Sequence, residues 1–375
     1  MNSRALRLVD RYAGTLLYIL LFLASKLYKP RTFANKRILA IKLWAVGETV
    51  LVLPALRELK EKGYTISFLS TPNNRDIAAA SGLFDEVICF DPKEPAGMVK
   101  TIRSLRERRY GIAMDFEPYA RFSAILSYIS GAGRRIGFAN RPLLYTDAVF
   151  PDERMHAVAN FARLANVLEE IRMPESLVPL RPSNAARRWV DAFLKKRGIR
   201  NGDVVVGIHA GSGASSVARR WREEKFGSLC RNLAEKYNAK VVLVGNETGV
   251  NRVIHSMAPG TIDASRKMRI EEIAAFMEQC ALCIANDSGI MHIAAAMGTP
   301  TIGLFGPNTP DCYGPYGKRC VGLYKGPGTP LIRPFRAQFP ETFEINYMDK
   351  ITVDDVMAAA KKLLASRPGA RIRRT

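Results

Sequence analysis

The most constraining feature of this chain is the stretch 280–315, which reads CALCIANDSGIMHIAAAMGTPTIGLFGPNTPDCYGP. Its first six residues are apolar and predict a buried strand, and the three polar residues that follow favour the N-cap of a helix. Apolar residues at helical spacing then lead to Gly298, which ends the helix, and residues 301–305 predict a second strand. The stretch therefore predicts a strand–helix–strand unit of a parallel sheet.

The junction between that strand and its helix is a candidate ligand site, because open parallel sheets bind ligands at the carboxyl ends of their strands. The free N–H groups of Ser288, Gly289 and Ile290 favour an anion, and a diphosphate suits them best. Asp287 precedes them, and His292 follows within about one turn. An ordinary capped helix with a satisfied histidine explains the same pattern, so both interpretations stand at this point.

Length and composition bound the class of protein. A chain of 375 residues exceeds one typical core and predicts two α/β domains, and 47% hydrophobic with 24% charged residues describes a globular protein. The net charge of +21 points to nucleic acid, an anionic membrane or a phosphorylated substrate. No nucleic-acid-binding motif accompanies it, so we expect no nucleic-acid partner. The cysteines show no secreted disulfide pattern, and Cys280 and Cys283 are predicted to be small core residues.

Residues 1–36 differ in character from the rest, because residues 12–25 carry no charge and basic residues flank them on both sides. The apolar run is shorter than the ~20 residues that a spanning helix needs. Lys26 follows it at once and no cleavage site precedes it, which argues against a secretory signal. We expect a hydrophobic helix that lies in an anionic leaflet. A helix packed on the globular domain is the alternative.

The first domain is expected at residues 37–183. Residues 38–43 predict a strand, and a glycine turn then leads into a helix that begins near Glu48. A carboxylate at that helix mouth would act as a general base toward an incoming hydroxyl. It would equally serve only to compensate the helix dipole, and spacing alone does not separate the two.

A polar group follows another predicted strand, at residues 111–115, and further basic residues follow a later helix. Such a cationic cluster suits an acidic or phosphorylated acceptor, whereas solvated surface charge is the alternative for any single arginine. The candidate acceptor-binding residues are Glu117, Arg121, Arg134 and Arg135. The proline-rich segment 172–183 then predicts the linker between the domains.

The second domain is expected at residues 184–375. Its first strand, residues 204–208, is followed by His209 and a loop of small residues that includes Gly211, Ser212 and Gly213, where backbone amides would approach a phosphate. The loop lacks the last glycine of a dinucleotide fingerprint, so a nicotinamide cofactor is not favoured and no cofactor is predicted. Glu247 follows the next strand, where it would bind a ribose hydroxyl or serve a helix N-terminus.

Two of these stretches resemble the signatures of a known family. NDSGIMHIAAAMGTPTIGLFGP resembles the donor-binding signature of glycosyltransferase family 9, the heptosyltransferase-like enzymes, and ILAIKLWAVGETVLVLPALRELK resembles the family's opening stretch. The segments SGAGRRIGF, HAGSG and RRWREEKF match in place and order. The resemblance covers residues 37–315, and residues 351–366 resemble the closing helix.

The resemblance implies a GT-B architecture, in which two Rossmann-like domains face one another across a cleft. The first would bind a glycolipid acceptor of the lipopolysaccharide core, and the second a nucleotide-sugar donor such as ADP-heptose. Transfer would be inverting and independent of metal, which agrees with the lack of a D-x-D pair, so no metal site is expected. Such an enzyme would work in the cytoplasm, at the inner face of the cytoplasmic membrane.

The resemblance also implies roles for single residues. The donor motif corresponds to Asp287, Ser288, Gly289 and His292, and the phosphate loop to Ser212 and Gly213. Glu48 stands where the family has an aspartate that is taken as the base, and Arg219 replaces a lysine that grips phosphate. A nucleotide-sugar epimerase of GT-B fold and a catalytically silent glycan- or nucleotide-binding protein at the membrane remain as alternatives.

Overall fold

The computed structural model describes residues 3–27, 33–140, 142–213, 217–328, 331–332, 335 and 345–365. Contacts divide the chain into one unit of Met1–Pro174 with Arg333–Phe339 and a second of Glu175–Ile332 with Pro340–Thr375. The change from one to the other falls inside the predicted linker. Phe335 belongs with the first unit because its ring packs against the rings of Phe138 and Phe161.

The first unit is built on a six-stranded parallel sheet in the order β3-β2-β1-β4-β5-β6. Its strands are β1 (Arg37–Ile41), β2 (Thr65–Ser70), β3 (Glu86–Cys89), β4 (Ile112–Asp115), β5 (Arg134–Phe138) and β6 (Asp147–Val149). Its helices are α1 (Ser3–Leu27), α2 (Val46–Glu61), α3 (Arg75–Ser81), α4 (Pro95–Glu107), α5 (Arg121–Ile129) and α6 (Ala157–Ala165), with the short η1 (Pro142–Leu144). Strand order reverses between β1 and β4, which is where a doubly wound sheet places its ligand site.

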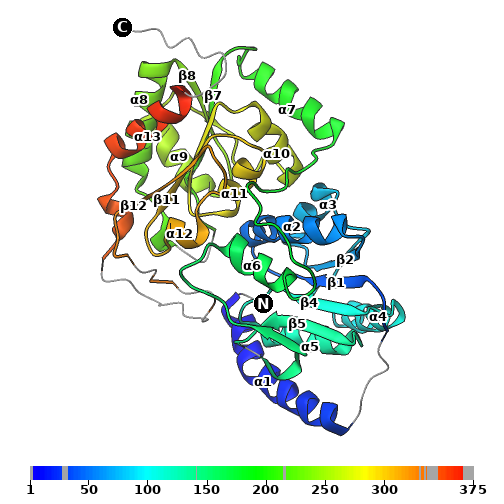
Figure 1. Cartoon of the computed structure of the whole chain (residues 1–375). Coiled ribbons are helices and arrows are strands. Elements are labelled where there is room, and N and C mark those ends of the chain that lie inside the picture. Colours follow the sequence, from blue (N-terminus) through cyan, green and yellow to red (C-terminus); the bar gives the residue numbers. More distant parts are fainter. Residues whose placement is uncertain are drawn as a thin grey trace. The chain divides into compact units, whose positions relative to one another are not determined.

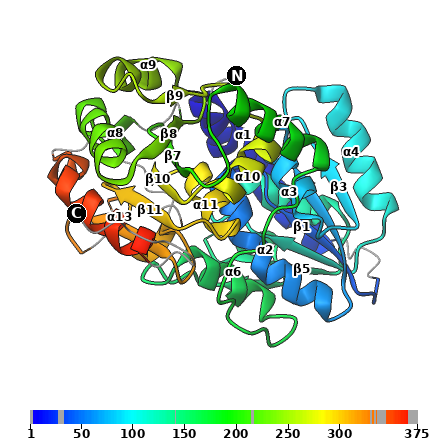
Figure 2. The ribbon, with the colours of Figure 1, turned by 90° about the horizontal axis from the view of Figure 1, so that it is seen from above.

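The second unit repeats that order, with a six-stranded parallel sheet β12-β11-β10-β7-β8-β9 (Figures 1 and 2). Its strands are β7 (Val204–His209), β8 (Ala239–Leu243), β9 (Ile262–Asp263), β10 (Leu282–Asn286), β11 (Thr301–Phe305) and β12 (Cys320–Tyr324). Its helices are α7 (Asn184–Lys196), α8 (Glu223–Tyr237), α9 (Thr248–Met257), α10 (Ile270–Gln279), α11 (Gly289–Ala296), α12 (Pro310–Tyr313) and α13 (Val353–Ala365), with the short η2 (Val217–Arg219) and η4 (Tyr347–Lys350). The strand–helix–strand unit predicted at 280–315 and the closing helix are confirmed.

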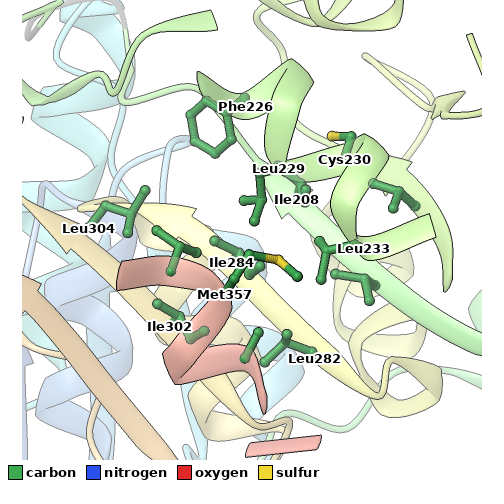
Figure 3. Close-up of a cluster of buried hydrophobic side chains, with 14 of the residues drawn as sticks. Ile208, Phe226, Leu229, Cys230, Leu233, Leu282, Ile284, Ile302, Leu304 and Met357 are labelled. Atoms are coloured by element: carbon green, nitrogen blue, oxygen red, sulfur yellow. The ribbon is translucent and has the colours of Figure 1, made fainter. Parts of the chain in front are cut away.

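The core of the second unit shows why these strands read as continuous apolar runs. Alternate residues of a strand point to opposite faces, and both faces of this sheet are covered by helices. Figure 3 shows Ile208 and Ile284 against Leu229 of α8 and Met357 of α13. Gly207 points to the other face, beside Phe276 of α10. Cys280 and Cys283 are buried and free, as predicted for small core residues.

Helix α1 packs on the first unit along one side only. Tyr18 is buried with residues of α5, and the Asp10 carboxylate accepts hydrogen bonds from the N–H groups of Arg121 and Phe122, which caps that helix. The other side leaves a row of large apolar side chains exposed, namely Tyr12, Leu16, Leu17, Ile19, Leu20 and Leu23. Among the described residues, no helix combines the length and apolarity needed to cross a bilayer. Packing on the domain is therefore observed, and membrane association stays a prediction.

Candidate active site

The reversal point of the second sheet brings together the two segments that the sequence singled out there. β7 and β10 are parallel neighbours with Ala285 opposite His209, so both strands end at the same edge. Asn286 ties the two ends, because its side-chain amide donates to the carbonyl of Ala210 at 2.7 Å. Its side-chain oxygen accepts from the N–H of Trp221 at 3.2 Å. The fold therefore positions the small-residue loop beside the N-terminus of α11.

The N-terminus of α11 keeps its backbone amides free of a side-chain cap. Ser288 is the N-cap residue, yet its hydroxyl makes no capping bond and lies 2.9 Å from Nδ1 of His209. The first amides of a helix are favourable anion donors when no side chain occupies them. Gly289 opens the helix, and His292 lies buried one turn further on. The helix start predicted from the sequence is confirmed, and diphosphate binding there stays a prediction.

Arg219 lies between the small-residue loop and the start of α11. Its guanidinium contacts the carboxylate of Asp287 at 3.3 Å and the carbonyl of Ser212 at 3.4 Å. Its Nε is buried and has no hydrogen-bond partner among the residues that the structure describes. Asp287 also accepts from the side-chain amide of Asn308 at 2.6 Å. A second cation, Arg220, donates to the Ser212 hydroxyl at 3.2 Å. Two guanidinium groups therefore flank the loop, and one of them is held in place by a buried carboxylate.

Glu247 supports the loop from behind. Its carboxylate accepts the N–H of Gly213 at 3.0 Å and that of Asn246 at 3.1 Å, and it lies 3.5 Å from Nε2 of His209. The hydrogen bond with His209 lowers the pKa of Glu247 to about 2, against the opposing effect of burial, so this carboxylate stays ionised. A Cβ on Gly211 would lie 2.2 Å from the Glu247 carboxyl carbon, which explains the glycine there.

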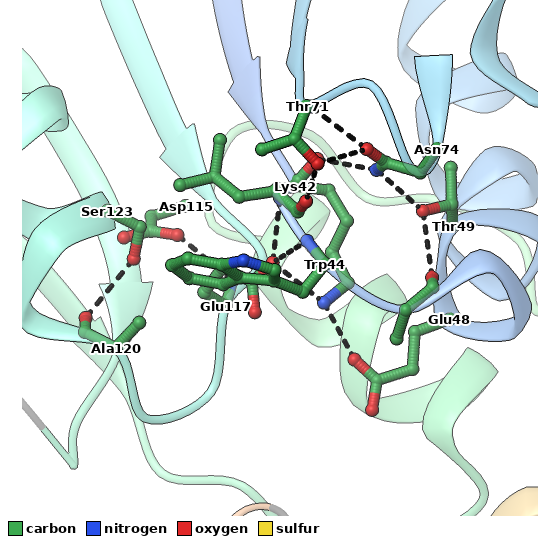
Figure 4. Close-up of polar contacts among 12 residues, drawn as sticks. Lys42, Trp44, Glu48, Thr49, Thr71, Asn74, Asp115, Glu117, Ala120 and Ser123 are labelled. Atoms are coloured by element: carbon green, nitrogen blue, oxygen red, sulfur yellow. Dashed lines mark hydrogen bonds and ion pairs between the residues drawn. The ribbon is translucent and has the colours of Figure 1, made fainter. Parts of the chain in front are cut away.

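The reversal point of the first sheet is built from charged groups. Lys42 follows β1 directly and is fully buried, with Nζ 2.7 Å from the Glu48 carboxylate and 3.0 Å from that of Glu117 (Figure 4). Burial alone would lower the pKa of Lys42, but the two carboxylates outweigh it and raise that pKa. Burial raises the pKa of Glu117, and Lys42 opposes part of that effect. We call Lys42, Glu48 and Glu117 the carboxylate–lysine cluster.

Several hydrogen bonds support the turn that leads to Glu48. Ala45 has φ 66°, a left-handed value that costs a non-glycine residue energy and needs support from its surroundings. The Thr49 hydroxyl donates to the Ala45 carbonyl at 3.0 Å, and the Asn74 amide donates to the Lys42 carbonyl at 2.8 Å and to Thr49 at 2.9 Å. Glu48 therefore enters the first turn of α2 from a fixed backbone.

Asp115, at the end of β4, adds a further buried acid. It accepts the Tyr145 hydroxyl at 2.7 Å and the N–H of Glu117 at 2.9 Å. Burial raises the pKa of Asp115 to about 7, although both hydrogen bonds act in the opposite direction. This carboxyl therefore titrates near neutral pH.

The four candidate acceptor-binding residues lie in different environments. Glu117 is buried in the cluster, and the Arg121 guanidinium lies 3.8 Å from Asp10 of α1. Arg134 pairs with Asp147 at 3.1 Å and donates to the Val167 carbonyl. Arg135 donates to the carbonyls of Leu144 and Ala132. The structure does not gather these residues into one group, and their contact with an acceptor stays a prediction.

Sequence reasoning did not single out three residues that shape the two sites. Lys42 follows a strand, where a lysine is normally solvated. Its complete burial is what marks it as a member of the charged group at the reversal point. Asn286 was interpreted as a cap, yet it bridges two strand ends. Arg220 neighbours Arg219 in a basic run, and only the contact with Ser212 distinguishes it.

Two six-stranded parallel sheets of the same strand order, each with polar or charged side chains at its reversal point, define two Rossmann-like α/β units. The sequence model of glycosyltransferase family 9 (heptosyltransferase) matches residues 98–328, which is more than half of the chain. The chain belongs to glycosyltransferase family 9. The family predicted from the motifs is thereby confirmed.

Individual relatives agree with that assignment. Lipopolysaccharide heptosyltransferase 2 of Escherichia coli (strain K12) is 24% identical over 226 residues, which are 56% of this chain and 63% of that protein. The matched segment thus spans less than two thirds of that relative. The solved structure of E. coli ADP-heptose lps heptosyltransferase II has a TM-score of 0.70 at 20% identity, covering 88% of this chain and 98% of that one. E. coli heptosyltransferase WaaC with ADP gives 0.66 at 19% identity, covering 87% and 99%. These likenesses establish the fold.

Proposed function

We propose that this protein transfers heptose from ADP-heptose to a lipopolysaccharide-core or related cell-envelope acceptor, with inversion and without a metal ion. The observation that carries the proposal is the reversal point of the second sheet, where an uncapped helix N-terminus and Arg219 converge beside a small-residue loop. Family membership and the relatives' names supply the sugar and the nucleotide.

The second unit would hold the donor. Amides of Ser288, Gly289 and Ile290 would bind the diphosphate, with His209 and His292 beside them, and the Arg219 guanidinium would supply the cationic grip. As the bond between the anomeric carbon and the diphosphate breaks, the electron pair leaves with ADP. Fixed donors aimed at that charge stabilise the leaving group. Glu247 would keep the loop in shape through its bond to the Gly213 amide.

The first unit would supply the base. The Glu48 carboxylate would take the proton of an acceptor hydroxyl, and the hydroxyl oxygen would then form the new bond to the anomeric carbon from the side opposite the diphosphate. Glu48 is suited to this because its side chain is 15% exposed, whereas those of Lys42 and Glu117 are 0% and 1% exposed. Glutamate in place of the family aspartate keeps the chemistry and lengthens the side chain by one methylene.

We further propose that the protein works on the cytoplasmic side of the inner membrane and contacts it through α1. The exposed apolar row of that helix and the basic residues around it suit an anionic lipid surface. Substituting Leu16, Leu20 and Leu23 by serine is expected to reduce cosedimentation with vesicles of anionic phospholipid at least several-fold. Exposed Val253 on α9, changed to serine, is the control. Undiminished vesicle binding by the triple variant would contradict this part.

The direct test of the proposed function is a transfer assay with ADP-heptose and purified lipopolysaccharide-core acceptors. We expect a glycosylated acceptor and free ADP in equal amounts, unchanged turnover in EDTA, and an inverted anomeric centre in the product. Loss of turnover in EDTA would contradict metal independence, and retention of configuration would contradict direct displacement. Donor consumption without acceptor would instead indicate an epimerase or hydrolase.

A further inference from the structure

The carboxylate–lysine cluster contains more charged groups than a single general base requires. A single buried ammonium, that of Lys42, contacts two carboxylates, so the cluster carries a net charge of −1 when all three groups are ionised. Glu48 is the most exposed of the three, with 15% of its side chain accessible to solvent. Replacing buried ion pairs by apolar residues is often neutral or stabilising, so stability alone does not explain a buried group of this kind. Its charges therefore indicate a functional task.

The chemistry of the proposed base gives that task. A carboxylate beside an ammonium is a weakened base, because taking up a proton removes its attraction to the cation. The second carboxylate offsets this penalty: once Glu48 is protonated, Lys42 and Glu117 remain as a neutral buried pair. Proton uptake therefore takes the cluster from −1 to 0, the direction that a low-dielectric environment favours.

We propose that Lys42 and Glu117 are positioning residues that together fix the orientation of Glu48 and set its proton affinity. This inference rests on the proposed role of Glu48 as the base. Lys42 holds the Glu48 carboxylate by a 2.7 Å contact, and Glu117 balances the charge of Lys42 at 3.0 Å.

Glu117 also ties the cluster to the backbone. The Oε1 atom that contacts Lys42 accepts the N–H groups of Leu43 at 2.7 Å and Trp44 at 3.0 Å. These residues precede Ala45, whose left-handed conformation leads into α2. A glutamine at 117 retains an oxygen that accepts those bonds while removing the charge. Glu117→Gln therefore separates the electrostatic role from the structural one.

Other titratable groups surround the cluster, and no substitution in the test replaces them. Asp115 and Tyr145 are linked to it through the N–H of Glu117. The helices that pack on α2 add further titratable groups, which are Arg75 and Asp76 of α3 and His156 and Arg163 at the start and end of α6.

The test compares the pH dependence of kcat/KM in Glu117→Gln and Lys42→Met. Removing the Glu117 charge leaves the Lys42 cation beside Glu48 without its second carboxylate, so the acidic limb is expected to move down by one pH unit or more, with a lower plateau. Removing Lys42 leaves two carboxylates together, so the limb is expected to move up by a similar amount. ADP affinity is expected to stay within twofold of wild type in both variants. A purely structural role would lower activity without opposite shifts.

Matched controls come from exposed or half-exposed ion pairs of the same unit. Glu107→Gln removes a carboxylate from the pair with Arg103, and Lys60→Met removes a cation from the pair with Asp85. Both are expected to keep the wild-type profile. If Lys42→Met does not fold, the double variant Lys42→Met with Glu117→Gln removes both charges together, and its limb is expected between those of wild type and Lys42→Met.

A second readout does not depend on turnover. The carboxyl ¹³C resonance of Glu48, assigned with Glu48→Gln, is expected to titrate at lower pH in Glu117→Gln than in wild type. An unchanged midpoint in Glu117→Gln, or shifts of both variants in the same direction, would overturn the inference. A wild-type protein that transfers no sugar would defeat the proposed function instead, and the carboxyl titration would still decide whether Lys42 and Glu117 set the proton affinity of Glu48.

Discussion

The two halves of this chain share one strand order and place different residues at its reversal point. Between β1 and β4 the sequence places Lys42, Glu48 and Glu117, one ammonium with two carboxylates, where we propose that the acceptor proton is taken up. Between β7 and β10 it places uncapped amides and Arg219, which are suited to hold an anion. Topology thus decides where each site lies, and the residues at the strand ends decide what it does.

The largest effect is expected from Glu48→Ala. Loss of the proposed base should lower kcat by about 10²–10⁴, the usual contribution of a positioned proton acceptor. ADP affinity should change little, because the donor contacts are assigned to the other unit. Steady-state kinetics with calorimetric titration of ADP checks both. Unaltered turnover would show that Glu48 is not the base and would contradict the role proposed for the first unit.

The reciprocal change is Arg219→Ala. A hydrogen bond to a charged group is worth about 1.5–3 kcal/mol, so ADP affinity should fall by about 10- to 100-fold. Calorimetry of ADP binding measures the loss. Arg231→Ala on α8 serves as the control, since the exposed Arg231 side chain donates to the Met257 carbonyl and the Ser228 hydroxyl. Equal affinity in Arg219→Ala and wild type would contradict its assigned role.

A smaller effect is expected from Gly211→Ala. The added methyl group would collide with the Glu247 carboxyl group and displace the loop. Overpacking of this kind costs about 1–3 kcal/mol, of which we expect part to appear as a roughly five- to tenfold weaker affinity for ADP. Gly249→Ala is the matched control, because it has open space and an ordinary backbone conformation. Identical ADP affinity in the two variants would show that Glu247 does not shape the loop.

The smallest effect is one of stability in the first unit. Because burial raises the pKa of Asp115 to about 7, the folded protein binds a proton that the unfolded chain releases near pH 4. The free energy of unfolding should therefore fall as pH rises, by about 1 kcal/mol between pH 5 and 6 from this group alone. Asp115→Asn should remove that part of the slope. Urea unfolding of both proteins at the two pH values measures it, and equal slopes would mean that Asp115 is ionised in the fold.

The sequence predicted the inner strands better than the outer ones. β11 was predicted to the residue, because all five of its residues are buried and most of them are apolar. β9 has two residues and β6 three, too few for a pattern, and β5 begins with two arginines. These strands were missed because their pairing, and not their composition, makes them strands.

The candidate-site residues also fall into two groups, those that local motifs predict and those that only long-range contacts bring together. Local motifs located His209, Ser288 and Arg219, since strand ends and helix starts are readable from short stretches. The role of Lys42 depends on its contact with Glu117. The pairing of β1 with β4 brings these two residues together. Long-range contacts of this kind leave no local pattern. The role of Glu247 in supporting the loop likewise becomes visible only through its bond to the Gly213 amide.

The measurement that tests the central claim most directly is hydrogen exchange of the full-length protein with and without ADP. Diphosphate binding at the reversal point of the second sheet predicts slower exchange at the amides of Ser288, Gly289 and Ile290. The amides of residues 43–48 should exchange at unchanged rates. Protection of residues 43–48 with none at 288–290 would contradict the assignment of the donor to the second unit.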